Sequence, residues 1–406
     1  MSKAAEIIAQ EIEKHEAIPF TRFMQLALYC PVYGYYEKEE DTIGRRGDYY
    51  TSVSVGPLFG GLLAFQFAAW LEEGHRARNG THSRREAEAQ TAQIVEAGAH
   101  NAQLARDILT WLRERRAAWF PRLEYWIVEP SARRQEWQKR TLAEFGDHVR
   151  WAGTLAGLGS ASSSQRGPSP PDTRHPDSVC GIIFANELLD AMPVQRLGWD
   201  AKRRVWFEWG VALQGDRFVW TRLADYSASR TPASPAPALD PRLSALLPDG
   251  FSIELCPLAA AWWRSAASAL RQGKLLTLDY GRTAEQLLAP GNTEGTLRAY
   301  RCHRPGADVL ADPGEQDITA HVDFTAIQAA GESAGLETEA FLTQAQFLTR
   351  VAARAWESQD SFGPWTQERT RQFQTLTHPE HLGRPFRVLV QKRARPQAQA
   401  AGDCSS

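Results

Sequence analysis

Acidic and amide side chains follow four short apolar runs in this sequence of 406 residues. Short apolar runs of this kind are typical of buried strands in a parallel sheet, which bind ligands at their carboxyl ends. We therefore expect these polar side chains to rim one edge of a sheet. The runs and the residues that follow them are Gln93–Val95 with Glu96 and Gly98, Leu123–Val128 with Glu129, Ile182–Phe184 with Asn186 and Glu187, and Lys274–Leu278 with Asp279.

The spacing after the first run separates two classes of nucleotide-like cofactor. A pyrophosphate is bound by G-x-G-x-x-G at a helix N-terminus, where bare backbone N–H groups meet the anion. Counting from Gly98, the later positions hold His100 and Gln103, and Glu96 would repel a phosphate. NAD and ATP are therefore disfavoured, and the sequence contains no G-x-x-x-x-G-K-[ST] loop.

A cationic ligand that carries a ribose fits these residues better. Gly98 permits close approach of the backbone, Glu96 suits an ammonium or sulfonium charge, and Glu129 can accept both ribose hydroxyls. S-adenosylmethionine has these parts and is the predicted cofactor. The same residues have a second interpretation, in which Gly98 serves only a turn and Glu96 is a solvated charge.

Apolar runs alternate with helical segments along most of the chain. Asn101 is expected to be the N-cap of a helix with one apolar face, and a polar helix is expected to end near Phe145. This alternation predicts an α/β fold with a doubly wound sheet and helices on both faces. Further strands are expected over Val149–Leu155, Leu336–Phe341 and Phe386–Val390, the last two with a helix between them.

The chain divides into a core with additions. Three β-rich runs within 193–256 predict a hairpin insertion, and residues 160–178, with six Ser and four Pro, are expected to be a disordered loop. We assign residues 1–75 to an N-terminal helical region and 91–345 to the core. Residues 346–395 are expected to complete the sheet with a helix and a strand, and 396–406 to form a disordered tail.

Composition excludes several classes of protein. Lys and Arg number 46 against 48 Asp and Glu, and this net charge of −2 does not favour nucleic acid or anionic lipid. Five cysteines without a C-x-x-C pair argue against a disulfide framework and a structural zinc site. No apolar stretch approaches the ~18 residues of a membrane span, and the first residues are rich in Glu, unlike a targeting segment. We therefore expect a cytoplasmic protein with no membrane and no nucleic-acid partner.

Several longer motifs are more specific than the strand ends. The set resembles the MidA-type family of S-adenosylmethionine-dependent methyltransferases, which includes the mitochondrial complex I assembly methyltransferases and many bacterial relatives. The resemblance covers roughly residues 15 to 345 in order. The motifs are Leu28–Tyr36, Gly47–Ser52, Ala185–Ala191 (ANELLDA), Leu278–Gly281, Gly295–Arg301 and Asp317–Phe324 (DITAHVDF).

The resemblance implies a class I methyltransferase (Rossmann-like) fold, with an N-terminal helical extension, a β-hairpin insertion and S-adenosylmethionine as cofactor. The family loop E-x-G-x-G-x-G falls on Glu96, Gly98, His100 and Ala102, so two of its three glycines are replaced. His100 places a Cβ where the backbone approaches the ligand and where a positive φ can be required. The implied cofactor-binding residues are Thr51, Ser52, Glu96, Gly98, His100, Asn101, Glu129, Asn186 and Glu187, and Gly47–Ser52 matches the segment that closes over the cofactor.

For the mitochondrial members the resemblance implies methylation of a protein arginine. Because a guanidinium is protonated in water, carboxylates must hold it and one group must accept its proton. The candidates are Glu187, Asp190, Asp317 and Asp323, with His321 as a proton relay. Each has an alternative role: Asp190 as a charge at a helix N-terminus, Asp323 as an N-cap and His321 as a structural hydrogen-bonding partner.

The predicted function is therefore S-adenosylmethionine-dependent methylation of a protein, at arginine. The alternative is a catalytically inactive relative that keeps the fold as an assembly or binding module and has lost the cofactor through its His100 loop. A third interpretation keeps the cofactor and transfers the methyl group to a small molecule. No metal is expected, because the spacing of His303, His321 and Asp323 is unspecific.

Overall fold

The computed structural model describes residues 1–38, 51–79, 91–158, 178–226, 241–301, 304–306 and 308–393. The disordered loop expected over 160–178 lies outside these residues except for Ser178. The expected tail 396–406 and the segment 47–50 also lie outside them. No helix in the described part of the chain is long and apolar enough to span a membrane.

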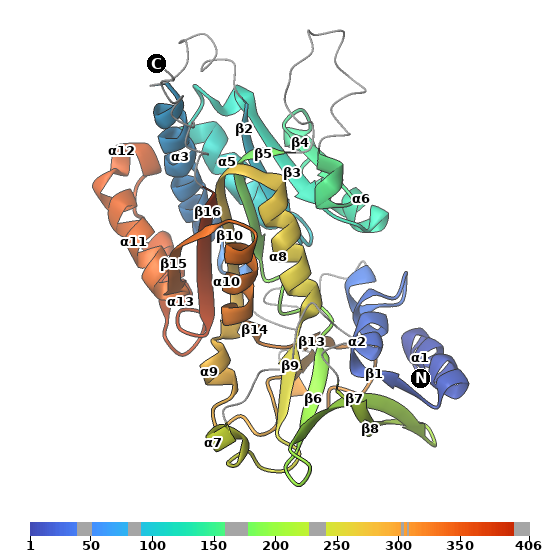
Figure 1. The fold of residues 1–406 in the computed structure, drawn as a ribbon. Coiled ribbons are helices and arrows are strands. Elements are labelled where there is room, and N and C mark those ends of the chain that lie inside the picture. Colours follow the sequence, from blue (N-terminus) through green and yellow to red (C-terminus); the bar gives the residue numbers. More distant parts are fainter. Residues whose placement is uncertain are drawn as a thin grey trace, which may run out of the picture.

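A central sheet runs through the molecule in the spatial order β4-β3-β2-β5-β10-β16-β15 (Figure 1). Strands β4, β3, β2, β5 and β10 are parallel, whereas β16 is antiparallel to β10 and β15. The chain runs from β2 outward to β4 and then returns to β5, so the order switches between β2 and β5. The strands are β2 (Ala92–Ala97), β3 (Leu123–Val128), β4 (Val149–Ala152), β5 (Val179–Asn186), β10 (Leu270–Arg282), β14 (Val322–Asp323, beside β10), β15 (Glu337–Thr343) and β16 (Phe386–Arg393).

Helices cover both faces of this sheet, which confirms the predicted doubly wound α/β fold. Successive strand residues face opposite sides: Ile94 packs in the cluster that contains α3, α5 and α11, and Val95 in the cluster that contains α8 and α10. Burial on both faces explains why the strands are continuous apolar runs. Figure 1 shows α8 and α10 in front of the sheet. The helices are α3 (Leu58–Asn79), α5 (Gln103–Arg115), α6 (Ala132–Thr141), α8 (Pro257–Ala269), α10 (Phe324–Ser333) and α11 (Gln344–Glu357).

The predicted hairpin insertion forms a second, antiparallel sheet of five strands. Its edge strand β1 comes from the N-terminal region and places Ile18 opposite Val211 of β7. Helices α1 and α2 pack against this sheet, whereas α3 packs against the central one, so the N-terminal region is shared between the two. The elements are α1 (Lys3–His15), β1 (Ala17–Pro19), α2 (Phe20–Tyr29), β6 (Gln195–Asp200), β7 (Val205–Gln214), β8 (Arg217–Asp225) and β9 (Ser252–Leu255).

Two local predictions were wrong. The strand expected over Val149–Leu155 ends at Ala152, and a 3-10 turn follows over Leu155–Leu158. Three helices rather than one separate the last two strands, because Gly363, with φ +102°, and Pro364 end one helix and Thr366 caps the next. The remaining elements are α7 (Pro241–Ser244), α9 (Ala284–Leu287), β11 (Arg298–Arg301), β12 (Arg304–Gly306), β13 (Asp317–Thr319), α12 (Gln359–Phe362) and α13 (Gln367–Thr377).

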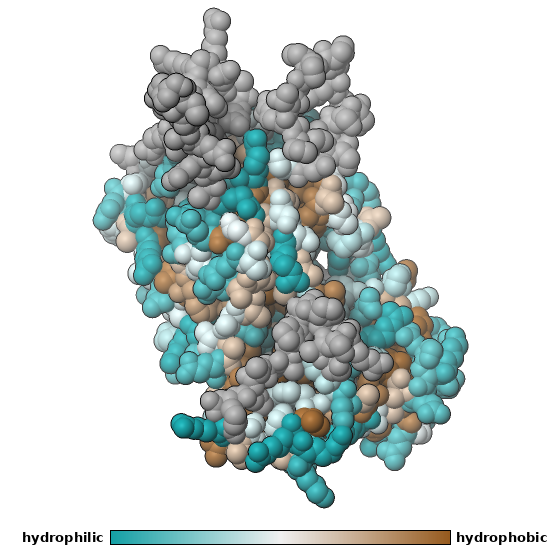
Figure 2. All heavy atoms as spheres, in the orientation of Figure 1, coloured by the Kyte–Doolittle hydropathy of each residue, from teal (hydrophilic) through white to brown (hydrophobic). Residues whose placement is uncertain are grey.

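Hydrophilic side chains cover much of the described surface on the face drawn in Figure 2, with hydrophobic ones scattered between them. Trp356, on α11, is one of a few large hydrophobic side chains that are more than half exposed. Scattered exposure of this kind is normal for a folded domain.

Candidate cofactor and catalytic site

A cavity of about 450 Å³ lies at the carboxyl ends of β2, β3 and β5, beside the switch in strand order. Eight of the nine predicted cofactor-binding residues line it. The ninth, Ser52, lies next to it and donates its backbone N–H to Glu187 Oε1 (3.2 Å). The lining residues are Tyr29, Tyr36, Thr51, Val53, Ser54, Glu96, Gly98, Ala99, His100, Asn101, Gln103, Leu104, Glu129, Arg134, Asn186, Glu187, Leu188 and Ala191.

The loop after β2 has positive φ at each of the three positions where the family pattern has glycine. The angles are +74° at Gly98, +45° at His100 and +64° at Ala102. A Cβ on Gly98 would lie 2.8 Å from Leu188 Cδ1, so Leu188 would have to shift to admit any side chain at this position. His100 and Ala102 adopt a conformation that costs a non-glycine residue roughly 1–2 kcal/mol. The chain therefore keeps the loop conformation despite two of the glycines being replaced.

The start of α5 differs from the prediction by one residue. The N-cap is Ala102 rather than Asn101, because the left-handed conformation at Ala102 delays the first helical residue to Gln103. The Asn101 side chain still accepts a hydrogen bond from the Gln103 N–H (3.1 Å). Asn101 thus satisfies one of the free N–H groups at the helix start.

Replacing His100 with glycine is expected to stabilise the protein, because it removes backbone strain. The free energy of unfolding should rise by about 1 kcal/mol, measured by urea denaturation, and the affinity for S-adenosylhomocysteine should stay equal or become tighter. Gly215→Ala is the converse control, because Gly215 has φ +60° in open space in the β7–β8 turn. That variant should lose stability and bind normally. A tenfold weaker affinity of His100→Gly would show that the imidazole itself contributes to binding.

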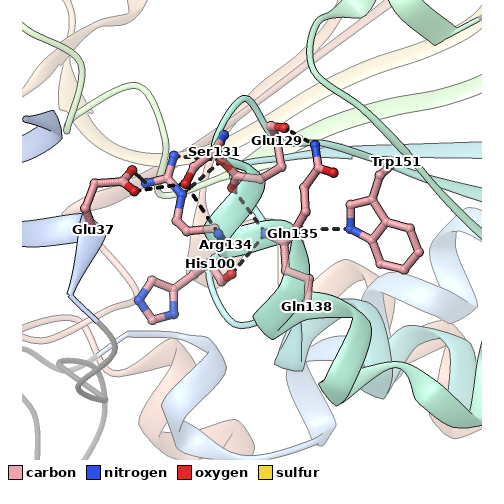
Figure 3. A network of polar contacts seen from close by, with 8 residues as sticks. All are labelled: Glu37, His100, Glu129, Ser131, Arg134, Gln135, Gln138 and Trp151. Atoms are coloured by element: carbon pink, nitrogen blue, oxygen red, sulfur yellow. Dashed lines mark hydrogen bonds and ion pairs between the residues drawn. The ribbon is translucent and has the colours of Figure 1, made fainter. Parts of the chain in front are cut away.

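Glu129, the predicted ribose-binding carboxylate, is buried in a network of polar contacts (Figure 3). Its Oε1 accepts hydrogen bonds from the Ser131 N–H (2.9 Å) and from Arg134 Nε (2.9 Å), and Arg134 Nη2 lies 2.7 Å away. The Arg134 guanidinium also faces Glu37, at 3.6 Å. Burial lowers the pKa of Arg134, but Glu129 and Glu37 outweigh it and the net shift is upward. These contacts hold the Glu129 side chain in a fixed orientation, which suits a group that accepts hydroxyl hydrogen bonds.

Asn186, at the end of β5, has a polar atom without a partner. Its Nδ2 donates to Glu187 Oε1 (3.2 Å), but its Oδ1 is buried and accepts no hydrogen bond from any described residue. A buried carbonyl left unpaired costs about 1–3 kcal/mol. Because Asn186 lines the cavity, a donor group of a bound ligand would satisfy it. The ammonium, hydroxyl and amino groups of S-adenosylmethionine are donors of this kind.

Glu96, at the end of β2, adds a carboxyl to the cavity across the switch in strand order from Asn186, which ends β5. The Tyr125 hydroxyl donates to its Oε2 (2.6 Å). Burial raises the pKa of Glu96 to about 7, and the hydrogen bond from Tyr125 partly opposes this shift. A cation next to Glu96 would favour its ionised form. Together with Glu129 and Asn186, Glu96 gives the cavity the hydrogen-bond acceptors and the acidic groups that the predicted cofactor requires.

Of the five candidate catalytic residues, Glu187 alone lines the cavity. Burial is the largest cause that raises its pKa to about 8, and the nearby Asp279 and Asp317 add to it. Hydrogen bonds from the Asn186 side chain and the Ser52 N–H act in the opposite direction. A carboxyl with a pKa near 8 is ionised, and can accept a proton, at weakly basic pH.

Asp190 is a neutral neighbour of this carboxyl. The neighbouring Asp279 is held by three backbone N–H groups. Its Oδ2 accepts hydrogen bonds from Leu188 (3.2 Å) and Leu189 (2.8 Å), and its Oδ1 accepts one from Tyr280 (2.8 Å). Burial and the neighbouring carboxylates raise the pKa of Asp190 well above its usual range, and it hydrogen-bonds to Asp279. Asp190 therefore holds a proton that it donates to Asp279, and it is not available as a base.

Asp317 does not line the cavity but contacts a tyrosine that does. The carboxylate is buried and accepts a hydrogen bond from the Tyr36 hydroxyl (2.8 Å). Tyr36 lines the cavity and stacks on Tyr29, with ring centroids 5.5 Å apart. Asp317 thus fixes the position of Tyr36 rather than facing a ligand itself.

The structure does not bring His321 into the cavity. Its ring packs against Tyr280, with centroids 4.4 Å apart, and burial lowers its pKa to about 3. Because it is neutral and remote, it is not the predicted proton relay. Asp323 is the N-cap of α10, as its alternative role proposed, and accepts two backbone N–H groups. His303 lies outside the described residues, among which no group of three or more His, Cys, Asp or Glu side chains is arranged to hold a metal.

Ten of the lining residues were not selected from the sequence, and four of these enter the argument above: Tyr29, Tyr36, Arg134 and Leu188. The two tyrosines lie seven residues apart within the Leu28–Tyr36 motif, so that motif was a signal for them. Leu188 lies in the ANELLDA motif, next to a residue that was selected. Arg134 is one of several cations in a polar helix, and nothing in its spacing distinguishes it.

Comparison with known proteins identifies the family. The model of a family of S-adenosyl-L-methionine-dependent methyltransferases matches residues 64–342, which is more than half of the chain. A COG1565 superfamily protein from Burkholderia thailandensis, solved with S-adenosyl-homocysteine bound, superposes with a TM-score of 0.75 at 28% identity. That match covers 97% of this chain and 93% of the other.

Two curated relatives are similar over nearly the whole chain. The "Protein arginine methyltransferase NDUFAF7 homolog, mitochondrial" of Drosophila melanogaster is 28% identical over 392 residues, 92% of this chain and 81% of the relative. The Homo sapiens "Protein arginine methyltransferase NDUFAF7, mitochondrial" is 25% identical over 395 residues, 94% of this chain and 81% of the relative. The chain therefore belongs to this family of S-adenosylmethionine-dependent methyltransferases, as the cavity at the ends of β2, β3 and β5 and the sequence motifs predicted.

Proposed function

We propose that this methyltransferase acts on arginine side chains of a protein substrate. The observation that carries the proposal is Glu187, a carboxyl that lines the cavity beside Asn186. A guanidinium stays charged at any physiological pH, so an acceptor site for it needs carboxylates. The names of the fly and human relatives, both protein arginine methyltransferases, support the same acceptor.

Different residues of the cavity would bind the cofactor and the acceptor. Glu96, Glu129 and Asn186 would hold the cofactor, which when bound supplies a methyl group on a positively charged sulfur. Glu187 would orient the guanidino nitrogen and take its proton, so that the nitrogen lone pair can form the new N–C bond. The electrons of the broken S–C bond remain on sulfur as a neutral thioether. Alignment of the two reacting atoms is the main contribution that the protein can make to such a displacement.

Transfer of a labelled methyl group tests the acceptor. The full chain is incubated with S-adenosylmethionine carrying a CD₃ group and with an extract of cells that lack this protein, and peptides are examined by mass spectrometry. Label on the guanidino nitrogens of protein arginines is the expected result. Label on small molecules alone would contradict the proposal, and binding of the cofactor without any transfer would favour the inactive binding module.

The affinity for S-adenosylmethionine is expected to rise with pH. Glu96 and Glu187 have pKa values raised to about 7 and about 8, so both are largely neutral at pH 6. A cation binds better to the ionised carboxyls. The Kd at pH 8.5 should therefore be roughly tenfold lower than at pH 6, which makes the binding free energy about 1.4 kcal/mol more favourable. Calorimetry in phosphate and in Tris should show that protons are released on binding.

The same two carboxyls, Glu96 and Glu187, make the stability of the free protein fall with rising pH, whereas the affinity rises. In the unfolded chain they ionise near the usual pKa of 4.5, whereas in the folded protein they keep their protons until pH 7–8. Between pH 4.5 and pH 7–8 the native state thus binds more protons than the unfolded chain, and the stability of the free protein falls as pH rises through this range. Glu187→Gln should reduce the number of protons released. Equal Kd values at pH 6 and 8.5 would contradict these assignments.

The cellular location of the reaction stays a prediction. The sequence favours the cytoplasm, whereas the names of the curated relatives place those proteins in mitochondria. Detection of the full chain in separated cell fractions decides between the two.

A further inference from the structure

A buried glutamine connects the cofactor loop to the ribose-binding carboxylate. Gln138 lies on α6, is 0% exposed and is not among the cavity-lining residues. Its Nε2 donates to the His100 carbonyl oxygen (3.0 Å) and to Glu129 Oε2 (3.1 Å), while its Oε1 accepts from Trp151 Nε1 (3.0 Å). Figure 3 shows this amide between the His100 carbonyl and Glu129, with the imidazole of His100 pointing away from both.

Trp151 determines which way the amide faces. An indole N–H can only donate, so the oxygen of the Gln138 amide must face Trp151. Both amide N–H bonds then point at acceptors of the cofactor site. One is the backbone of the loop after β2, and the other is the carboxylate at the end of β3.

The loop needs such support because two of its glycines are replaced. His100 and Ala102 hold positive φ angles that non-glycine residues rarely adopt. The hydrogen bond from Gln138 fixes the carbonyl of His100, which is one of these strained residues. At the other end, Glu129 Oε1 is already occupied by Ser131 and Arg134, so Oε2 is the oxygen with capacity left for a ribose hydroxyl. Gln138 occupies one side of Oε2 and fixes the direction of the other.

We propose that Gln138 is a positioning residue for S-adenosylmethionine: its single amide sets the separation between the loop at His100 and the carboxylate of Glu129. It acts through these two groups and does not touch the cofactor. The proposal concerns the cofactor side of the site and does not depend on which acceptor is methylated.

The chain contains a matched control. Gln391, on β16, is also 0% exposed. Its Oε1 accepts from Trp263 Nε1 (2.7 Å), and its Nε2 donates to the Gln328 carbonyl (2.9 Å) and to Thr338 Oγ1 (3.0 Å). It has the same kind of partners as Gln138 but does not contact a residue of the cofactor cavity. Substitutions at the two positions should therefore cost similar stability and differ only in binding.

The test compares Gln138→Met with Gln391→Met in the full chain, by calorimetric titration with S-adenosylhomocysteine and by thermal unfolding without it. Both variants should have lower Tm values. Only Gln138→Met should weaken binding, by about 30-fold, which corresponds to about 2 kcal/mol. Affinities of the two variants within threefold of each other would overturn the proposal.

A milder pair of variants covers the case in which Gln138→Met does not fold. Trp151→Phe keeps a large ring and removes the donor that orients the Gln138 amide, and Trp263→Phe does the same to Gln391. We expect Trp151→Phe to weaken binding of S-adenosylhomocysteine by about fivefold, or about 1 kcal/mol, and Trp263→Phe to leave it unchanged. Equal affinities in this pair would also contradict the positioning role.

Discussion

Gly98→Val should abolish the binding of S-adenosylhomocysteine. The new Cβ would lie 2.8 Å from Leu188 Cδ1, and valine, as a β-branched residue, is strongly disfavoured at φ +74°. Relief of either conflict moves the loop or Leu188, both of which line the cavity. We expect Kd to rise more than about 100-fold, a loss of about 2.7 kcal/mol or more, measured by calorimetry.

Gly153→Val is the matched control for this substitution. Gly153 follows β4 at the same edge of the sheet, and a Cβ there has no atom within 4 Å. This variant should bind S-adenosylhomocysteine like the parent protein. If Gly98→Val binds normally as well, the cofactor does not lie against the loop after β2.

The second large effect is expected from Glu187→Gln. The amide keeps the shape of the side chain but cannot take a proton, and a general base typically contributes about 10²–10⁴-fold to the rate. We expect methyl transfer to fall by roughly 10³-fold, while the affinity for S-adenosylhomocysteine changes less than tenfold because Glu96, Glu129 and Asn186 remain. Initial rates with the CD₃-labelled cofactor and calorimetric titration give the two numbers.

The variant Asp190→Asn tests whether Glu187 or the neighbouring Asp190 is the base. Asp190 is protonated and donates to Asp279, and an asparagine N–H can make the same hydrogen bond. The rate should therefore fall less than tenfold. If Asp190→Asn lost as much activity as Glu187→Gln, the proton would go to Asp190, and our assignment of the base would be wrong.

The fold was predictable because each strand of the core carries its own signal. Burial on both faces made β2, β3, β5 and β10 continuous apolar runs, and polar residues followed them where the cavity lies. The boundaries of the weaker elements were not predictable in this way. The strand at 149–152 is short, and the start of α5 depends on the left-handed conformation of Ala102, which is unusual for an alanine.

The site was predictable where a motif or a strand end marked it and not elsewhere. Glu96 lies at the end of a strand, and Glu129 and Glu187 follow strands, so their positions in the chain placed them at one edge of the sheet. Arg134, in the first turn of α6, and Gln138, farther along the same helix, act through contacts that the position of α6 creates. Sequence alone also did not distinguish Glu187, inside the cavity, from Asp190 beside it, because the difference lies in a hydrogen bond to Asp279.

A titration of the full chain with S-adenosylhomocysteine at pH 8 tests the central claim most directly: that the loop with His100 and Ala102 still forms a cofactor site. We expect one site per chain with a Kd of roughly 10 µM or lower, equivalent to about −7 kcal/mol. The heat should disappear in Gly98→Val and persist in Gly153→Val. No detectable binding by the parent protein at about 1 mM ligand, about −4 kcal/mol, would contradict the account.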